Sequence, residues 1–214
     1  MARRRADPPL DTDLEDLPPE ARWREWMGRV EAVAFAAAQP VPRAVLASLV
    51  GRDCNLDQLI RDIRAELRAR PYDLVPVAGG WQLRTRPAFG PAIRAAGVAP
   101  ETGTDLSAAD AAVLVAIAYF QPVTRAELGT ILGKEIGRDT VARLRDDGLI
   151  APGPRSPQPG APYTYVTTPE FLARWGLDGL HELPDLEKLR DAGLLSKADA
   201  LAAAGVPQPP GENA

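Results

Sequence analysis

The sequence contains very little of the residues from which most catalytic and metal sites are built. Its 214 residues include one cysteine, Cys54, and one histidine, His181. A single cysteine forms no internal disulfide, and neither residue has a second cysteine or histidine at the short spacing that zinc ligands need. His181 has no nucleophile motif to work with, and no glycine-rich phosphate-binding loop is present. We therefore expect no enzyme, and no catalytic, cofactor or metal site.

Long hydrophobic runs are missing as well. The longest apolar stretch covers residues 111–120, roughly half the length of a membrane-spanning helix. The arginine cluster near the start has no apolar stretch behind it, which does not fit a secretory signal. With 45% hydrophobic and 25% charged residues, the composition is that of a globular protein. We therefore expect a cytoplasmic protein without membrane contact.

Proline, by contrast, is plentiful, and over half of the 22 prolines fall in three short stretches. These stretches lie within residues 1–19, 152–162 and 207–210. Because proline fixes φ and lacks an N–H donor, they predict a non-helical arm, an internal loop and a tail. The formal net charge is −4, and the surplus of positive charge is confined to residues 21–98, where arginines mix with acids. Such a mild surplus is a weak argument for DNA as the main partner.

The most informative pattern is an internal repeat with an offset of 82 residues. Residues 33–51 align with residues 115–133, and ten of the 19 aligned positions are identical. The matches include a Gln-Pro-Val-x-Arg-Ala block and a closing glycine. Two related domains in tandem explain this pattern better than a chance match between two helix-turn-helix segments.

Both copies predict the same order of elements. In the second copy, capping-box patterns that begin at Ser107 and Thr124 start two helices, and a third helix follows. Two β-prone runs come next, at residues 149–150 and 163–167. In the first copy, Asn55 caps the third helix. Three helices followed by two strands describe a winged helix.

The first copy also contains a hairpin signal. Its strands are expected at residues 74–77 and 81–85, around Gly79-Gly80, a dipeptide favoured in primed turns. The third helix of each copy mixes arginines and acids, which favours contacts with proteins over reading of DNA. A winged-helix DNA-binding transcriptional regulator stays open as the alternative function.

The sequence thus predicts a mainly α fold with small β wings, made of two tandem winged-helix domains with a flexible N-terminal arm and C-terminal tail. The expected boundaries are an arm at residues 1–25, a first domain at 26–98, a linker at 99–106, a second domain at 107–184, and an acidic, proline-rich tail at 185–214.

Several stretches resemble the family of segregation and condensation protein B (ScpB). In the second domain these are residues 118–133, which contain Gln-Pro-Val-Thr-Arg-Ala-Glu-Leu, and residues 160–172, which read Gly-Ala-Pro-Tyr-Thr-Tyr-Val-Thr-Thr-Pro-Glu-Phe-Leu. Residues 31–36 and 79–86 look like the opening helix and first wing of the family. The resemblance covers about residues 27–186.

The resemblance implies a non-enzymatic scaffold subunit of the bacterial SMC condensin, which supports chromosome condensation and segregation before cell division. Proteins of this family form homodimers, mainly through the first domain, and bind the kleisin ScpA, which connects them to the SMC ATPase. Apolar grooves on the winged helices would bind kleisin helices. The implied location is the cytoplasm, at the nucleoid, with at most weak auxiliary DNA contact. The sequence departs from the family pattern at Phe120, Leu132 and Ala161, where arginine is usual.

Six residues of the second domain are candidates for partner contact: Tyr119, Gln121, Arg125, Thr167, Thr168 and Phe171. The first three lie at the corner between two helices and either shape that corner or contact a partner. The two threonines fit a strand end and a helix N-cap, with a ligand site as the alternative. In the first domain, Trp23 and Trp26 either pack within their own domain or across a dimer.

Overall fold

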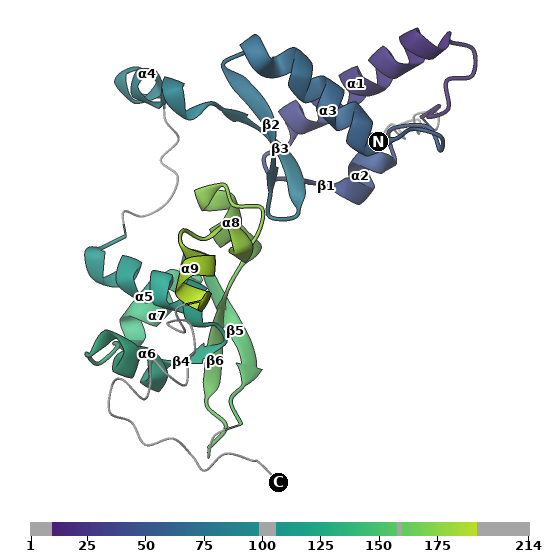
Figure 1. The fold of residues 1–214 in the computed structure, drawn as a ribbon. Coiled ribbons are helices and arrows are strands. Elements are labelled where there is room, and N and C mark those ends of the chain that lie inside the picture. The colour runs from purple at the N-terminus through teal and green to yellow at the C-terminus, as the bar shows by residue number, and fades with distance from the viewer. Residues whose placement is uncertain (1–9, 99–105, 158–159, 192–214) are drawn as a thin grey trace, which may run out of the picture. The chain divides into compact units, whose positions relative to one another are not determined.

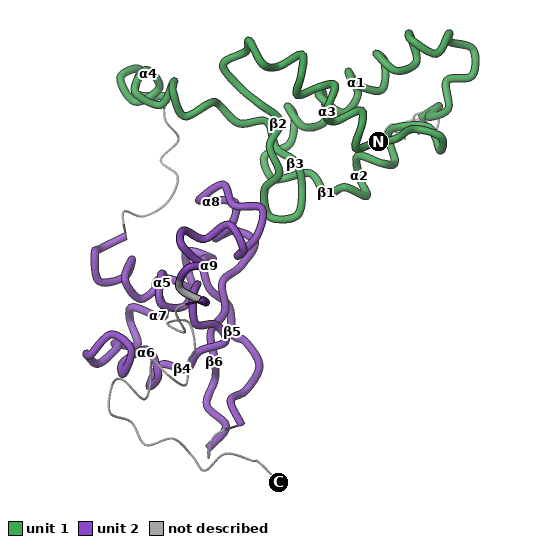
Figure 2. Tube along the Cα trace, viewed as in Figure 1, with its two compact units in different colours: residues 1–99 green, residues 100–214 purple. Residues whose placement is uncertain are grey.

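The computed structural model describes residues 10–98, 106–157 and 160–191 (Figure 1). The chain divides into two compact units, residues 1–99 (unit 1) and 100–214 (unit 2), shown in Figure 2. Each unit is mainly helical and contains one small antiparallel sheet. The expected mainly α class with small β elements is confirmed. None of the helices in the described ranges is long and apolar enough to cross a membrane.

Unit 1 packs its first three helices against a three-stranded sheet. Its helices are α1 (Pro19–Ala36), α2 (Arg43–Ala47), α3 (Leu56–Glu66) and α4 (Gly90–Ala95), and its strands are β1 (Val41–Pro42), β2 (Tyr72–Val77) and β3 (Gly80–Thr85). The strand order is β1-β3-β2. The core residues Val30, Leu46, Leu59, Ile63 and Leu74 are fully buried and come from three helices and β2. Helices and sheet therefore share one core.

The hairpin of unit 1 turns one residue earlier than Gly79-Gly80 suggests. Ala78 and Gly79 both have positive φ, 51° and 74°, as a two-residue type I′ turn requires. Gly80 is instead the first residue of β3, paired with Pro42 of β1. A Cβ atom at Gly80 would lie 2.9 Å from the carbonyl oxygen of Val41. This glycine is therefore needed for the close approach of two strands, while its neighbour makes the turn.

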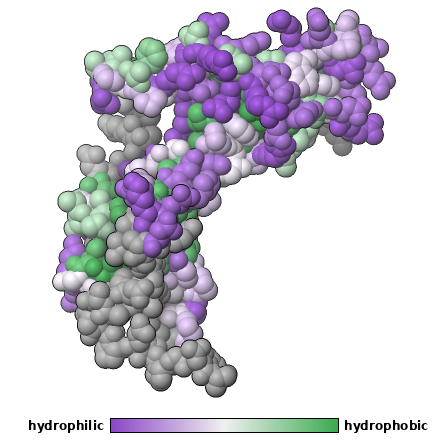
Figure 3. All heavy atoms as spheres, in the orientation of Figure 1, coloured by the Kyte–Doolittle hydropathy of each residue, from purple (hydrophilic) through white to green (hydrophobic). Residues whose placement is uncertain are grey.

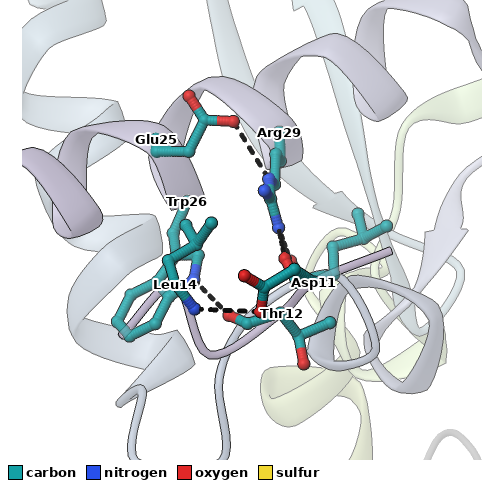
Figure 4. Close-up of polar contacts among 7 residues, drawn as sticks. Asp11, Thr12, Leu14, Glu25, Trp26 and Arg29 are labelled. Carbon is teal, nitrogen blue, oxygen red and sulfur yellow. Dashed lines mark hydrogen bonds and ion pairs between the residues drawn. The ribbon is translucent and has the colours of Figure 1, made fainter. Parts of the chain in front are cut away.

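The start of unit 1 also differs from the expected arm over residues 1–25. Helix α1 begins at Pro19, and the segment before it folds back against the helix (Figure 4). The Trp26 indole N–H donates to the Thr12 carbonyl at 2.8 Å, and Arg29 donates to the Asp11 carbonyl at 2.6 Å. The segment at residues 10–18 therefore packs against the rest of unit 1. Residues 1–9 lie outside the described ranges.

Unit 2 repeats the order of unit 1 through its last strand, and two helices follow that strand where unit 1 has one. Its helices are α5 (Ala108–Phe120), α6 (Arg125–Leu132), α7 (Arg138–Asp146), α8 (Pro169–Trp175) and α9 (Leu186–Asp191), and its strands are β4 (Val123–Thr124), β5 (Ile150–Arg155) and β6 (Tyr163–Thr167). The strand order is β4-β6-β5. Ile117, Leu128, Leu144 and Leu149 are fully buried. Of the expected tail, residues 185–191 are described and contain α9.

Strand β5 extends into the proline-rich stretch that the sequence predicts as a loop. Pro152 and Pro154 both lie within it. The strand is at the edge of the sheet, where a residue without an N–H can be accommodated, and its register against β6 shifts between Pro152 and Arg155. The prediction of a loop over residues 152–162 is therefore wrong for its first part.

Local capping patterns place the helix starts of unit 2. Thr124 and Glu127 form the complete capping box before α6: Glu127 N–H donates to the Thr124 hydroxyl at 3.2 Å, and Thr124 N–H donates to the Glu127 carboxylate at 2.7 Å. At α5, Ser107 accepts from the Asp110 N–H at 3.1 Å. The Asp110 carboxylate, however, pairs with Arg143 of α7 at 2.8 and 3.2 Å. The box expected at Ser107 is therefore a simple N-cap.

Candidate functional site

The side chain of Gln121 links the corner after α5 to the end of β6. Its amide N–H₂ donates to the Ala118 carbonyl at 3.2 Å, and its amide oxygen accepts from the Thr167 backbone N–H at 2.7 Å. The same side chain is bonded to the Thr167 hydroxyl at 3.0 and 3.1 Å. Since Thr167 ends β6, these bonds tie the helix to the sheet. Both side chains therefore use their polar groups inside the unit.

Thr168 is the N-cap of α8, as the sequence predicts. Its hydroxyl accepts from the Phe171 N–H at 3.2 Å and donates to the Gly148 carbonyl at 2.6 Å. Pro169 follows at the first helical position, where its missing N–H costs nothing. The cap thereby orients α8, and with it Phe171, against the rest of unit 2.

An apolar groove of about 560 Å³ is formed by α5, α8 and the segment after α8. Among the residues that line it are Leu114, Val115, Tyr119, Phe171, Trp175 and Leu183, and none of the lining residues is charged. We call this surface the apolar groove. Figure 3 shows hydrophobic residues gathered over α5, whereas the visible face of unit 1 is mostly hydrophilic.

The apolar groove has a buried floor and an exposed rim. Leu114 and Phe171 at the floor are 2% and 5% exposed, whereas Val115 and Trp175 at the rim are 53% and 46% exposed. The Trp175 and Phe171 rings pack at 4.9 Å between centroids. The Tyr119 hydroxyl donates to the Pro184 carbonyl at 2.6 Å, which holds the segment after α8 against α5. Contacts within unit 2 therefore hold the walls of the groove together, and the apolar side chains at its rim are exposed to solvent.

Sequence reasoning finds Tyr119 and Phe171 but misses Val115 and Trp175. A signal for both was present. Trp175 follows Phe171 by four residues, so the two share a face of α8. Helix α5 is apolar on nearly all sides, and a small unit buries only part of such a helix. The remaining apolar face has to meet solvent or a partner.

Arg125 belongs to a different surface, which we call the cationic cleft. This cleft of about 590 Å³ lies between the start of α6, α7 and β6. It is lined by Arg125, Arg138, Val141, Arg145, Tyr163 and Tyr165, among others, and by no acidic residue. The structure therefore separates the six candidates: two line the apolar groove, three hold the corner and the helix cap, and one lines the cleft.

The sequence does not reveal that α7 has a cationic side, because its arginines and aspartates nearly balance in number. Arg138 and Arg145 are seven residues apart and share a face of the helix. Arg143 lies on another face, where its guanidinium pairs with the buried Asp110. This hydrogen-bonded arginine, with help from the Ser107 and Thr140 hydroxyls, holds the pKa of Asp110 below its ordinary value. One arginine of α7 is thus structural, and two face the cleft.

Trp23 and Trp26 of α1 both pack within unit 1. Trp26 is 6% exposed, and the Trp23 indole N–H donates to the Asp62 carboxylate at 3.1 Å. The two rings meet edge to face, 6.2 Å apart. The large exposed apolar side chain of α1 is instead Phe35, which is 83% exposed.

The remaining candidates for chemistry lie apart from one another. Within the described part of the chain, no three His, Cys, Asp or Glu residues come together as a group that could hold a metal ion. Burial raises the pKa of the Cys54 thiol. His181 is exposed in the short 3₁₀ helix Leu180–Glu182.

Comparisons with known proteins agree on one family. The profile of "Segregation and condensation complex subunit ScpB" matches residues 28–186. Segregation and condensation protein B of Desulforamulus reducens is 36% identical over 162 residues, which are 74% of this chain and 88% of the relative. Its counterpart from Bacillus subtilis is 31% identical over 176 residues, 80% of this chain and 88% of the relative.

Among solved structures, ScpB from Mycobacterium tuberculosis aligns at 27% identity with a TM-score of 0.33, covering 72% of this chain and 97% of that chain. The profile match over most of the length, together with relatives above 30% identity, confirms the resemblance noted in the sequence. The chain belongs to the ScpB family of segregation and condensation complex subunits.

Proposed function

We propose that the chain is a non-enzymatic scaffold subunit of the SMC condensin that binds the kleisin ScpA and so supports chromosome condensation and segregation. The observation that carries this proposal is the uncharged apolar groove of unit 2 with its exposed rim. Membership of the ScpB family supplies the setting. In this proposal ATP hydrolysis belongs to SMC, which the chain reaches through the kleisin at the nucleoid.

Each unit is, in this proposal, a winged helix. Both units have the order helix, short strand, two helices, two strands, and in both the short strand pairs with the last strand. The hairpins β2–β3 and β5–β6 would be the wings. The repeat in the sequence supports a common plan for a first domain at residues 26–98 and a second at 107–184, with a linker between them.

The apolar groove fits an amphipathic helix of the kleisin. Such helices place apolar residues at i, i+3, i+4 and i+7, which together form a ridge about as long as a groove between two helices. Covering the exposed half of Val115 would contribute roughly 1 kcal/mol at the usual value per buried area, and covering that of the larger Trp175 would contribute roughly 2–3 kcal/mol. Tyr119 and Phe171 would then contact the kleisin, whereas Gln121, Thr167 and Thr168 would hold the surface in shape.

Homodimerisation would use unit 1. Phe35 leaves most of its ring in water at the end of α1, and aromatic side chains are the commonest anchors of protein interfaces. A second copy that covers this ring would remove the largest exposed aromatic surface among the described residues of unit 1.

A sequence-specific DNA-binding regulator is the weaker reading. The family match does not favour it, and α7 carries Asp139 and Asp146 beside its arginines. Acids on a recognition helix oppose the approach of phosphates.

The test is titration calorimetry with the ScpA-like kleisin of the same cell. Val115→Glu places a charge on the groove rim, where a partner would bury it without a counter-ion, and kleisin affinity should fall at least about tenfold. Val98→Glu, at a valine of unit 1 that is 70% exposed, is the matched control and should bind like the parent protein. Absence of a complex at micromolar concentration, or equal binding by Val115→Glu, would contradict the proposal.

A further inference from the structure

The cationic cleft of unit 2 shares no lining residue with the apolar groove. We propose that it binds an acidic peptide segment of a protein partner, with carboxylates paired to Arg125, Arg138 and Arg145 and an apolar side chain between them. This site goes beyond the proposed function, in which the kleisin helix occupies the apolar groove.

The charge of the cleft is concentrated and poorly neutralised. Arg125 opens α6, and Arg138 and Arg145 come from α7, so two elements direct three guanidinium groups to one cavity. Neither Arg125 nor Arg138 has an ion pair with a residue in the described ranges. Arg145 has Asp146 at 3.6 Å, but both side chains are more than half exposed, so this pair contributes little. Three arginines therefore remain available to a ligand.

The floor and walls of the cleft suit a peptide. Val141 and Ala142 of α7 supply apolar surface between the arginines, and Tyr163 and Tyr165 of β6 face them. The guanidinium of Arg155 lies 3.8 Å from the centre of the Tyr163 ring and holds that wall in place. The volume of 590 Å³ falls in the usual range of ligand sites, about 300–1,000 Å³. The planar guanidinium group of arginine forms two parallel hydrogen bonds with a carboxylate, so such a site prefers carboxylate ligands.

Duplex DNA fits the cleft less well than a peptide. Asp139 and Asp146 follow Arg138 and Arg145 by one residue each, so they form a neighbouring stripe on α7. The Asp146 side chain is 71% exposed. A duplex lying along α7 would bring its phosphates towards these carboxylates, whereas a peptide inside the cleft contacts only the arginine stripe.

The arginine cluster of unit 1 is different, because an acid lies within it. Asp73 is 3.6 Å from Arg64 and 3.5 Å from Arg86, and these side chains line the same small cavity. The carboxylate partly neutralises the cluster. The cleft of unit 2 has no such residue in its lining and is the better anion site.

The test uses the full chain and a short fluorescein-labelled peptide that alternates glutamate and leucine. Fluorescence anisotropy should show binding that falls at least about tenfold in the triple variant Arg125→Gln, Arg138→Gln, Arg145→Gln. A matched triple variant outside the cleft (Arg24→Gln, Arg70→Gln, Arg94→Gln) carries the same net charge and should bind like the parent. Circular dichroism verifies that both variants are folded.

Three further measurements separate the alternatives. A peptide with glutamine in place of glutamate should not bind, and Val115→Glu should leave peptide binding unchanged, which distinguishes the cleft from the apolar groove. The proposal is overturned if the matched triple variant loses as much affinity as the cleft variant, since binding would then follow net charge alone. It is also overturned if the cleft variant loses binding to a short DNA duplex but not to the acidic peptide.

Discussion

Replacing Gln121 by alanine tests whether this residue shapes unit 2 or contacts a partner. The substitution removes the bonds to the Ala118 carbonyl and to the Thr167 hydroxyl, and it leaves the half-buried Thr167 N–H without its acceptor at 2.7 Å. A neutral hydrogen bond contributes about 0.5–1.5 kcal/mol net, and an orphaned buried donor costs about 1–3 kcal/mol. Part of this loss is recovered by water because the site is half-buried. We expect unit 2 to lose about 2 kcal/mol of stability.

For a domain of this size, that loss lowers the midpoint of thermal unfolding by about 8–16 °C. Calorimetry of the full chain should show the shift in one transition only, and hydrogen exchange should show reduced protection of the Thr167 amide. Gln39→Ala is the matched control, because Gln39 is the residue of unit 1 that aligns with Gln121 in the repeat, and it is exposed. An unchanged midpoint and unchanged Thr167 protection, with kleisin binding lost, would refute the reasoning and assign Gln121 to a partner contact.

Three other predictions concern charge, backbone packing and assembly. Because Arg143 lowers the pKa of Asp110 in the folded state, the ion pair stabilises unit 2 above the ordinary aspartate pKa, and this contribution is lost as pH falls through the lower folded value. Urea unfolding should therefore show Asp110→Asn less stable than the parent near neutral pH, with a difference that shrinks in acid. Gly80→Ala forces a Cβ to within 2.9 Å of the Val41 carbonyl oxygen and should cost about 1–3 kcal/mol in urea unfolding. In the proposed homodimer Phe35 lies in the interface, so Phe35→Asp should shift light scattering from dimer towards monomer because a buried charge disrupts an interface.

Matched variants serve as controls for the predictions at Gly80 and Phe35. Gly28→Ala adds a methyl group in α1 that meets no atom within 4 Å, so it should not destabilise unit 1. Phe89→Asp, at a ring that is 45% exposed, should leave the oligomeric state unchanged. A difference between Asp110→Asn and the parent that stays constant with pH would contradict the assignment of the ion pair.

Most of the confirmed predictions rest on local sequence patterns. The N-caps at Asn55, Thr124 and Thr168 each involve groups within three residues of one another, so a short stretch of sequence contains the whole interaction. The turn at Gly79 was missed by one residue because Gly80 looks like a turn glycine. Its actual constraint comes from β1, which is distant in the sequence.

The two candidate surfaces also depend on contacts between segments that are distant in the sequence. By its count of charged residues, α7 is nearly neutral. Arg143, however, pairs with Asp110, which lies 33 residues earlier, so its charge is not available on the cleft side. What remains on the cleft side is cationic. Val115 likewise looks like a core residue within the apolar helix α5, and only the packing of that helix places it at 53% exposure.

The sequence by itself determined the order of elements within each repeat, the four helix starts marked by N-caps, the repeat of two units and the family, because these depend on neighbouring residues and on matching stretches. The tertiary structure alone decided which apolar and charged side chains face solvent together. The apolar groove joins α5 to α8, and the cationic cleft joins α6 and α7 to β6. Exposure and charge pairing are set by contacts between segments that are far apart along the chain, so no local pattern contains them.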